Sequence, residues 1–124
     1  MEHHPAQSVK LADQYLAAAK LCLELRLTNP AVSMAVHSAI HAKDAVYLKE
    51  RYTIPKPRSH SQASGDLRSL GVLKESAIRQ FARLIASKSE AEYGQEDLPV
   101  LDAVASIQDA ERFLASVKKF LGSI

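Results

Sequence analysis

Several features are scarce in this sequence of 124 residues, and each absence excludes a class of protein. The only cysteine is Cys22, so an internal disulfide framework is excluded and a reducing, cytoplasmic location is expected. No apolar run approaches the roughly 18 to 20 residues of a membrane span. The opening segment MEHHPAQS has neither a basic nor an apolar stretch, so it does not read as an export signal. We therefore expect a cytoplasmic protein without a membrane partner.

Glycine and tryptophan are also scarce, with four and none respectively, whereas alanine is abundant. Alanine has the highest helix propensity and glycine one of the lowest, so the composition favours an all-α fold. The length suits one domain over residues 1–124. The net charge of +2 is too small to indicate a nucleic-acid-binding protein by itself.

Apolar spacing predicts an up-and-down bundle of four long helices and one short helix. The long helices are predicted over 9–26, 30–51, 74–92 and 99–121, with Ser8 and Asn29 as caps of the first two. Residues 1–7 are expected to be frayed. Residues 52–65 hold two prolines and no apolar period, so they are predicted as a long loop, whose end overlaps the short helix predicted over 62–70.

The second predicted helix carries polar groups beside its apolar stripe. Measured from Val36 at 100° per residue, His37, His41 and Asp44 fall at about 80° to 140°, on one flank. Three interpretations are open for this flank: a structural or interface role, a polar site for a nucleotide or nucleic acid, and a transition-metal site with ligands at i, i+4 and i+7. Helical metalloproteases carry a glutamate after the first histidine, and Ser38 is there instead.

Common catalytic signatures are absent from the sequence. It has no phosphate-binding loop, no G-x-G-x-x-G, no G-x-S-x-G and no C-x-x-C, which excludes kinase, Rossmann and common hydrolase chemistry. No cofactor is predicted. Basic residues gather around the predicted loop at Lys49, Arg51, Lys56 and Arg58, where they are either solvated or placed to approach phosphate.

Four segments together resemble the HEPN domains, helical bundles of prokaryotic toxin-antitoxin, defence and nucleotidyltransferase-associated systems. The segments are ADQYLAAAKLCLELR, HSAIHAKDAVYLKE, PRSHSQASGDLRSLG and ASKSEAEYG. In this resemblance His41 takes the family's glutamine position, Asp44 its acidic position and His60 the histidine after the loop. The resemblance implies a homodimer with a polar cleft formed by helices two and four. The partners that it implies are an antitoxin or nucleotidyltransferase-type protein, RNA or a nucleotide.

Many members of this family are metal-independent ribonucleases with an R-x(4-6)-H signature, and that signature is missing here. No arginine precedes a histidine at that spacing, and Glu92-Tyr93 stands where relatives read arginine-tyrosine. We therefore predict a homodimeric, non-catalytic binding or interaction module. Its binding or interface residues are predicted to be His37, His41, Asp44, Arg51, Arg58, His60 and Tyr93. The alternative is a divergent ribonuclease toxin that rebuilds its site from His37, His41 or His60 with Arg51 or Arg58.

Overall fold

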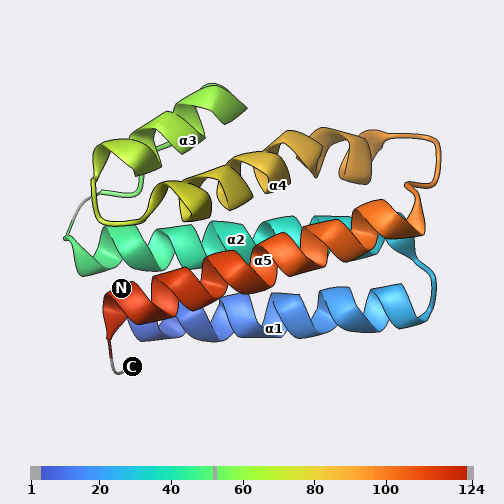
Figure 1. The fold of residues 1–124 in the computed structure, drawn as a ribbon, viewed down its shortest axis with the longest axis horizontal. Coiled ribbons are helices and arrows are strands. Elements are labelled where there is room, and N and C mark those ends of the chain that lie inside the picture. The colour runs from blue at the N-terminus through green and yellow to red at the C-terminus, as the bar shows by residue number, and fades with distance from the viewer. Residues whose placement is uncertain (1–3, 52, 123–124) are drawn as a thin grey trace.

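The computed structural model describes residues 4–51 and 53–122, and this part of the chain consists of five helices without a strand. The helices are α1 (Pro5–Glu24), α2 (Thr28–Lys49), α3 (His60–Ser69), α4 (Glu75–Tyr93) and α5 (Val100–Leu121). The four long helices lie side by side and α3 is short (Figure 1). The predicted all-α bundle of four long helices and one short helix is confirmed.

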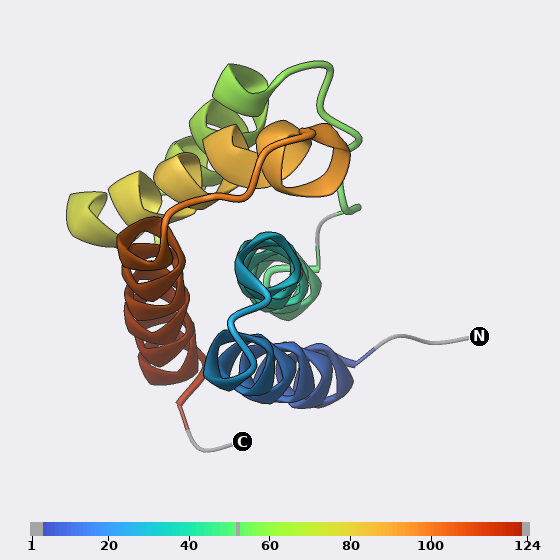
Figure 2. The same cartoon turned by 90° about the vertical axis from the view of Figure 1, so that its right-hand side faces the viewer.

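The long helix α2 is packed against three others. It contacts α1, α4 and α5, whereas α3 lies on the outer side of the bundle against α4 (Figure 2). Small side chains on α2 permit these close contacts, because Ala35, Ser38 and Ala39 are fully buried. The Ser38 hydroxyl donates a hydrogen bond of 2.8 Å to the backbone oxygen of Ala12 on α1. One side of α2, between α1 and α4, is not covered by another of the described helices (Figure 2), and polar residues can lie there.

Aromatic rings join α4 and α5 in the core. Phe81 and Phe113 are almost fully buried, with ring centroids 5.3 Å apart and planes tilted by 36°. Tilted pairs of this kind stabilise beyond the area that they bury. The two helices are therefore held at a fixed spacing on the side of the bundle that also contacts α2.

Two helix starts differ from the prediction. The first helix begins at Pro5, with His4 as its N-cap, so Ser8 is not a cap and residues 5–7 are helical. Proline suits the first turn of a helix because its missing N–H has no intrahelical partner there. The second helix begins at Thr28, so Asn29 is not a cap either. The Asn29 side-chain oxygen Oδ1 accepts a 2.7 Å hydrogen bond from the Leu98 N–H, and this bond ties the start of α2 to the α4–α5 connection.

The predicted long loop is wrong in its last part, because α3 begins at His60. Ser59 caps this helix, with its Oγ accepting a 3.1 Å hydrogen bond from the Gln62 N–H. The serine-rich sequence made this segment look irregular, but a serine in this position is a preferred helix cap. Of the loop as predicted, Tyr52 lies outside the described residues. The irregular segment before α3 is therefore shorter than predicted, and His60 is the first residue of α3.

Candidate functional site

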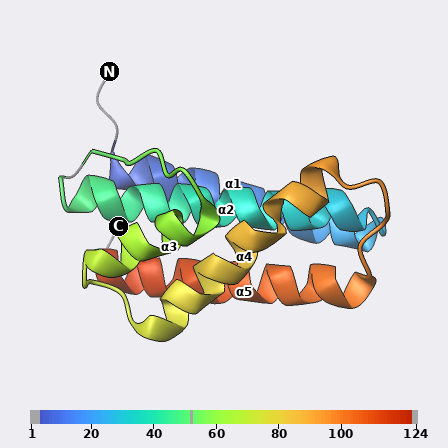
Figure 3. The ribbon, with the colours of Figure 1, turned by 90° about the horizontal axis from the view of Figure 1, so that it is seen from above.

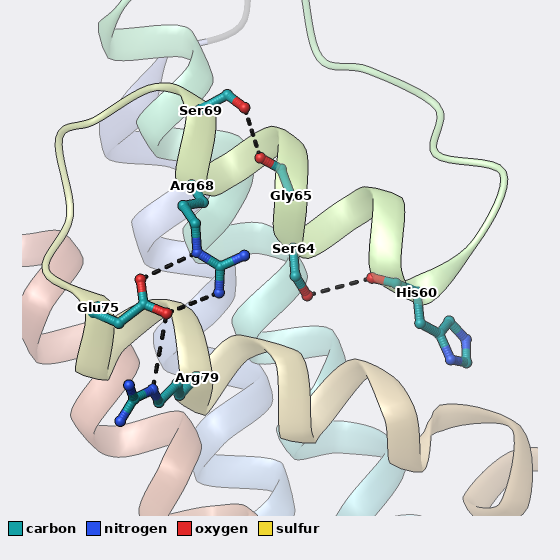
Figure 4. Close-up of polar contacts among 7 residues, drawn as sticks. All are labelled: His60, Ser64, Gly65, Arg68, Ser69, Glu75 and Arg79. Atoms are coloured by element: carbon teal, nitrogen blue, oxygen red, sulfur yellow. Dashed lines mark hydrogen bonds and ion pairs between the residues drawn. The ribbon is translucent and has the colours of Figure 1, made fainter.

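The short helix α3 is attached to α4 by an ion pair. Arg68 donates two hydrogen bonds to the Glu75 carboxylate, at 3.1 and 2.9 Å, and Arg79 lies 3.8 Å from the same carboxylate (Figure 4). The fully buried Leu67 anchors α3 to the core. Figure 4 shows the His60 ring extending away from α3, while its backbone oxygen accepts a hydrogen bond from Ser64.

An open pocket of about 590 Å³ lies between α2, the segment before α3, α3 itself and α4. We call it the α2–α4 pocket. Its apolar lining consists of Ile40, Pro57, Ala63, Phe81 and Ile85, and its polar lining of Lys43, Arg58, Ser59, His60 and Lys88. None of these lining residues is acidic. An apolar floor with a few polar groups around it is the usual form of a small-molecule site.

The cations of the α2–α4 pocket are not equally free. Lys43 Nζ lies 2.7 Å from Asp44 Oδ1, and Lys88 Nζ lies 2.9 Å from Glu92 Oε2. Among the described residues, no ion pair involves Arg58, whose side chain is exposed at the rim. The positive charge that is free for a ligand therefore comes first from Arg58, with the two lysines held in place by their carboxylates.

Glu92 on α4 is the centre of a polar cluster that reaches back to α2. Its Oε1 accepts hydrogen bonds from Ser33 Oγ at 3.2 Å and from His37 Nε2 at 2.8 Å, and its Oε2 accepts one from Lys88. The hydrogen bond from Lys88 is the main reason why the pKa of Glu92 is lowered, and His37 and Ser33 add to this against the opposing effect of burial. Glu92 is therefore a carboxylate that orients both His37 and Lys88.

The two helix-two histidines face the Tyr15 ring of α1. The His41 and Tyr15 rings stack with centroids 5.0 Å apart, and His37 lies 5.7 Å from the same ring. Burial lowers the pKa of His41, an effect larger than the opposing one of Asp44. Both histidines do lie on one flank of α2, but neither lines the α2–α4 pocket.

The interpretation of His37, His41 and Asp44 as metal ligands gains no support. In residues 4–51 and 53–122, no three His, Cys, Asp or Glu side chains form a group that could hold a metal ion. Asp44 is paired with Lys43 and His37 with Glu92. These contacts use the groups that a metal would need, so we do not propose a metal site here.

Of the residues predicted for a site, the structure brings Arg58 and His60 together in the α2–α4 pocket. Arg51 follows the end of α2 in a left-handed conformation (φ 63°) and does not line the pocket. Tyr93 is 78% exposed at the end of α4. Lys43 and Lys88 were missed as pocket residues. The sequence does carry a signal for Lys43, which stands seven residues after Val36 and so falls on the apolar stripe of α2. A lysine in that position must extend to a polar surface.

No helix within the described residues combines the length and the apolar character needed to cross a membrane.

The described residues form a helical bundle in which a pocket lined by Lys43, Arg58 and Lys88 lies between α2 and α4. The family model for the HEPN domain matches residues 6–123, and the chain therefore belongs to the HEPN family. It is also 27% identical over 123 residues to a protein of Methanocaldococcus jannaschii named as a "putative toxin". This alignment covers 94% of the present chain and 87% of that relative.

Proposed function

We propose that this protein is a non-catalytic HEPN binding module that holds a phosphate-bearing ligand, a nucleotide or an RNA end, in the α2–α4 pocket. The observation that carries this proposal is the lining of the pocket, where Lys43, Arg58 and Lys88 surround an apolar floor that includes Phe81. Lysine and arginine side chains are the common ligands of phosphate oxygens. The apolar floor offers a surface for a base.

The start of α3 adds to this preference for anions. Ser59 and His60 line the pocket at the N-terminus of a ten-residue helix, where N–H groups and the helix dipole favour negative charge. This contribution comes from the backbone and does not depend on a side chain. Arg58 lines the same pocket directly before this helix start, so a phosphate bound there would also be close to the Arg58 side chain.

A binding role is favoured over catalysis by the state of the histidines. Proton transfer at a ribose hydroxyl needs oriented acid and base groups within reach of the substrate. His60 is the single imidazole in the pocket, and within the described residues no hydrogen bond orients its ring. His37 is tied to Glu92, and His41 stacks on Tyr15.

Calorimetric titration with AMP, ATP and a short 5′-phosphorylated RNA tests this proposal. We expect Arg58→Ala to weaken binding at least tenfold, because a hydrogen-bonded contact to a charged group contributes about 1.5 to 3 kcal/mol and about 1.4 kcal/mol is a tenfold change. Arg51→Ala is the matched control, since Arg51 is exposed and outside the pocket. Equal losses in both variants, or no binding by the unmodified protein, contradict the proposal.

A divergent ribonuclease toxin is the second candidate, favoured by the presence of Arg58 and His60 in one pocket. It predicts cleavage of RNA by purified protein and loss of cleavage in His60→Ala, whereas His41→Ala leaves cleavage intact. RNA that remains whole after prolonged incubation with the protein supports the binding module instead.

The partner is proposed to be a second copy, with an antitoxin-type protein as a further partner in the cytoplasm. The most exposed large apolar side chains support a contact surface, because they all lie where α1 meets α2 and α4 meets α5, at one end of the bundle (Figure 1). They are Leu21, Leu25, Leu27, Tyr93, Val100 and Leu101. Light scattering after gel filtration tests the dimer, and we expect Leu25→Glu with Leu101→Glu to yield a monomer.

A further inference from the structure

A second groove lies on the other side of α4 from the α2–α4 pocket. Two adjoining hollows of about 280 and 310 Å³ share Lys74, Ser116 and Lys119 in their linings. They run between the start of α4 and the C-terminal half of α5, two segments that lie near each other in Figure 3. We call them together the α4–α5 groove. It shares no lining residue with the α2–α4 pocket.

The α4–α5 groove has cations that the protein itself does not neutralise. Lys74, Arg112 and Lys119 are exposed in its lining, and none of them forms an ion pair within the described residues. This is not true of cations in general here, since Lys118 beside them pairs with Asp13 at 2.8 Å. No acidic residue lines the groove. Three free positive charges therefore surround it.

One end of the groove is apolar. Val72, Leu73 and Phe120 line it there, and all three side chains are only partly buried against the core. Partly exposed apolar side chains beside cations offer a partner both apolar area to bury and charges to pair with. The groove thus combines an apolar end with three cations, which is the complement of a segment that carries both apolar and acidic side chains.

Gln80 supplies an independent observation in the same groove. It lines the groove, it is 9% exposed, and its side-chain oxygen Oε1 is buried without a hydrogen-bond partner within the described residues. Buried polar atoms are rarely left unpaired. The missing group is a hydrogen-bond donor, because a carbonyl oxygen only accepts. A peptide N–H is such a donor, whereas phosphate oxygens at neutral pH are mainly acceptors.

We propose that the α4–α5 groove binds an acidic, amphipathic segment of a partner protein. Its carboxylates pair with Lys74, Arg112 and Lys119, and its apolar side chain covers the end at Phe120. The Gln80 side-chain amide turns toward the groove when the segment binds, and its oxygen accepts a backbone N–H. A phosphate group by itself pairs with the cations, but it neither covers the apolar end nor donates a hydrogen bond to the Gln80 oxygen. This inference is separate from the proposed ligand of the α2–α4 pocket and does not depend on it.

Fluorescence anisotropy with a labelled amphipathic peptide of glutamate and leucine tests the groove. We expect saturable binding that is lost when glutamine replaces every glutamate in the peptide. The double variant Lys74→Glu with Lys119→Glu is expected to raise the Kd about tenfold, since each exposed ion pair contributes little alone and reversal also adds repulsion. Lys10→Glu with Lys56→Glu, two exposed lysines outside the groove, is the matched control and is expected to leave the Kd nearly unchanged.

Gln80→Met separates binding from folding. If Oε1 accepts a peptide N–H, this variant binds the acidic peptide more weakly while its melting temperature is equal or higher, because a buried unpaired oxygen has been removed. Three results overturn the proposal. They are no saturable binding of the acidic peptide, equal Kd values in the groove and control variants, and groove-dependent binding of a labelled RNA or of a second copy in place of the peptide.

Discussion

The Glu92 cluster offers a sharp test of the structure, because one carboxylate holds three partners from two helices. Glu92→Gln keeps the shape of the side chain and removes its charge. The amide then presents an NH₂ group either to Lys88 or to Ser33 and His37, all of which donate hydrogen bonds to the carboxylate. The variant therefore loses the hydrogen bonds at the position that its NH₂ group takes. The hydrogen bonds to its remaining oxygen become weaker, because that oxygen no longer carries a negative charge.

The expected loss can be worked out from these contacts. Net contributions of hydrogen bonds to charged groups are about 1.5 to 3 kcal/mol, and i,i+4 ion pairs on a helix contribute about 0.3 to 0.5 kcal/mol. The Glu92 side chain is only 16% exposed, whereas Lys88 is 32% exposed, so water screens their ion pair and keeps the expected total near the lower end of the first range. We therefore expect a loss of about 2 kcal/mol in the free energy of unfolding. With an unfolding entropy of about 2.1 cal/mol/K for each of 124 residues, the melting temperature falls by about 8 °C.

Thermal unfolding followed by circular dichroism measures this loss and its pH dependence. The folded-state pKa of Glu92 is lowered from its ordinary value of 4.5. Its stabilisation is therefore fully present above about pH 4.5 and is lost as the pH falls through the lower folded-state pKa. Below that pH the unmodified protein has also lost the charge, so the difference in melting temperature between it and Glu92→Gln narrows.

Glu90→Gln is the control, since Glu90 is an exposed glutamate of the same helix without an ion pair in the described part of the chain. We expect it to change stability by less than about 0.5 kcal/mol. If Glu92→Gln behaves like Glu90→Gln at neutral pH, or if its deficit is the same in acid, Glu92 does not organise this cluster and the reasoning is refuted.

Three further predictions concern groups outside the pocket. Tyr47→Phe should leave stability equal or raise it by up to about 1 kcal/mol in chemical denaturation, because the Tyr47 hydroxyl is buried without a partner in residues 4–51 and 53–122. Arg83→Met should lower stability by about 1 kcal/mol in the same assay, since it strands the mostly buried Asp109, which Arg83 binds at 2.9 and 2.7 Å. Burial lowers the pKa of His41 from its ordinary value of 6.5, so its ring should protonate below that value in NMR titration, and a midpoint at or above 6.5 contradicts this. Because the unfolded chain then binds the proton more readily, the unmodified protein loses stability as the pH falls below 6.5, and His41→Phe should reduce that loss.

The candidate site was only partly predictable from the sequence. Arg58 and His60 could be predicted as site residues because they are basic residues in one short segment, and both line the α2–α4 pocket. The flank of His37 and His41 was also readable, because two residues four apart on a helix share a side. What covers that side was not readable. Tyr15 and Glu92 cover that side of α2, and Glu92 is 55 residues away from His37 in the chain.

The sequence by itself determined the helices, because apolar spacing and helix propensity act over a few neighbouring residues. Even the missed starts of α1 and α3 carried local signals, Pro5 and the cap Ser59. Only the tertiary structure decided which polar residues meet. Lys43 and Lys88 enter one pocket because α2 and α4 pack together, and the position of a residue around its own helix does not state which helix lies opposite.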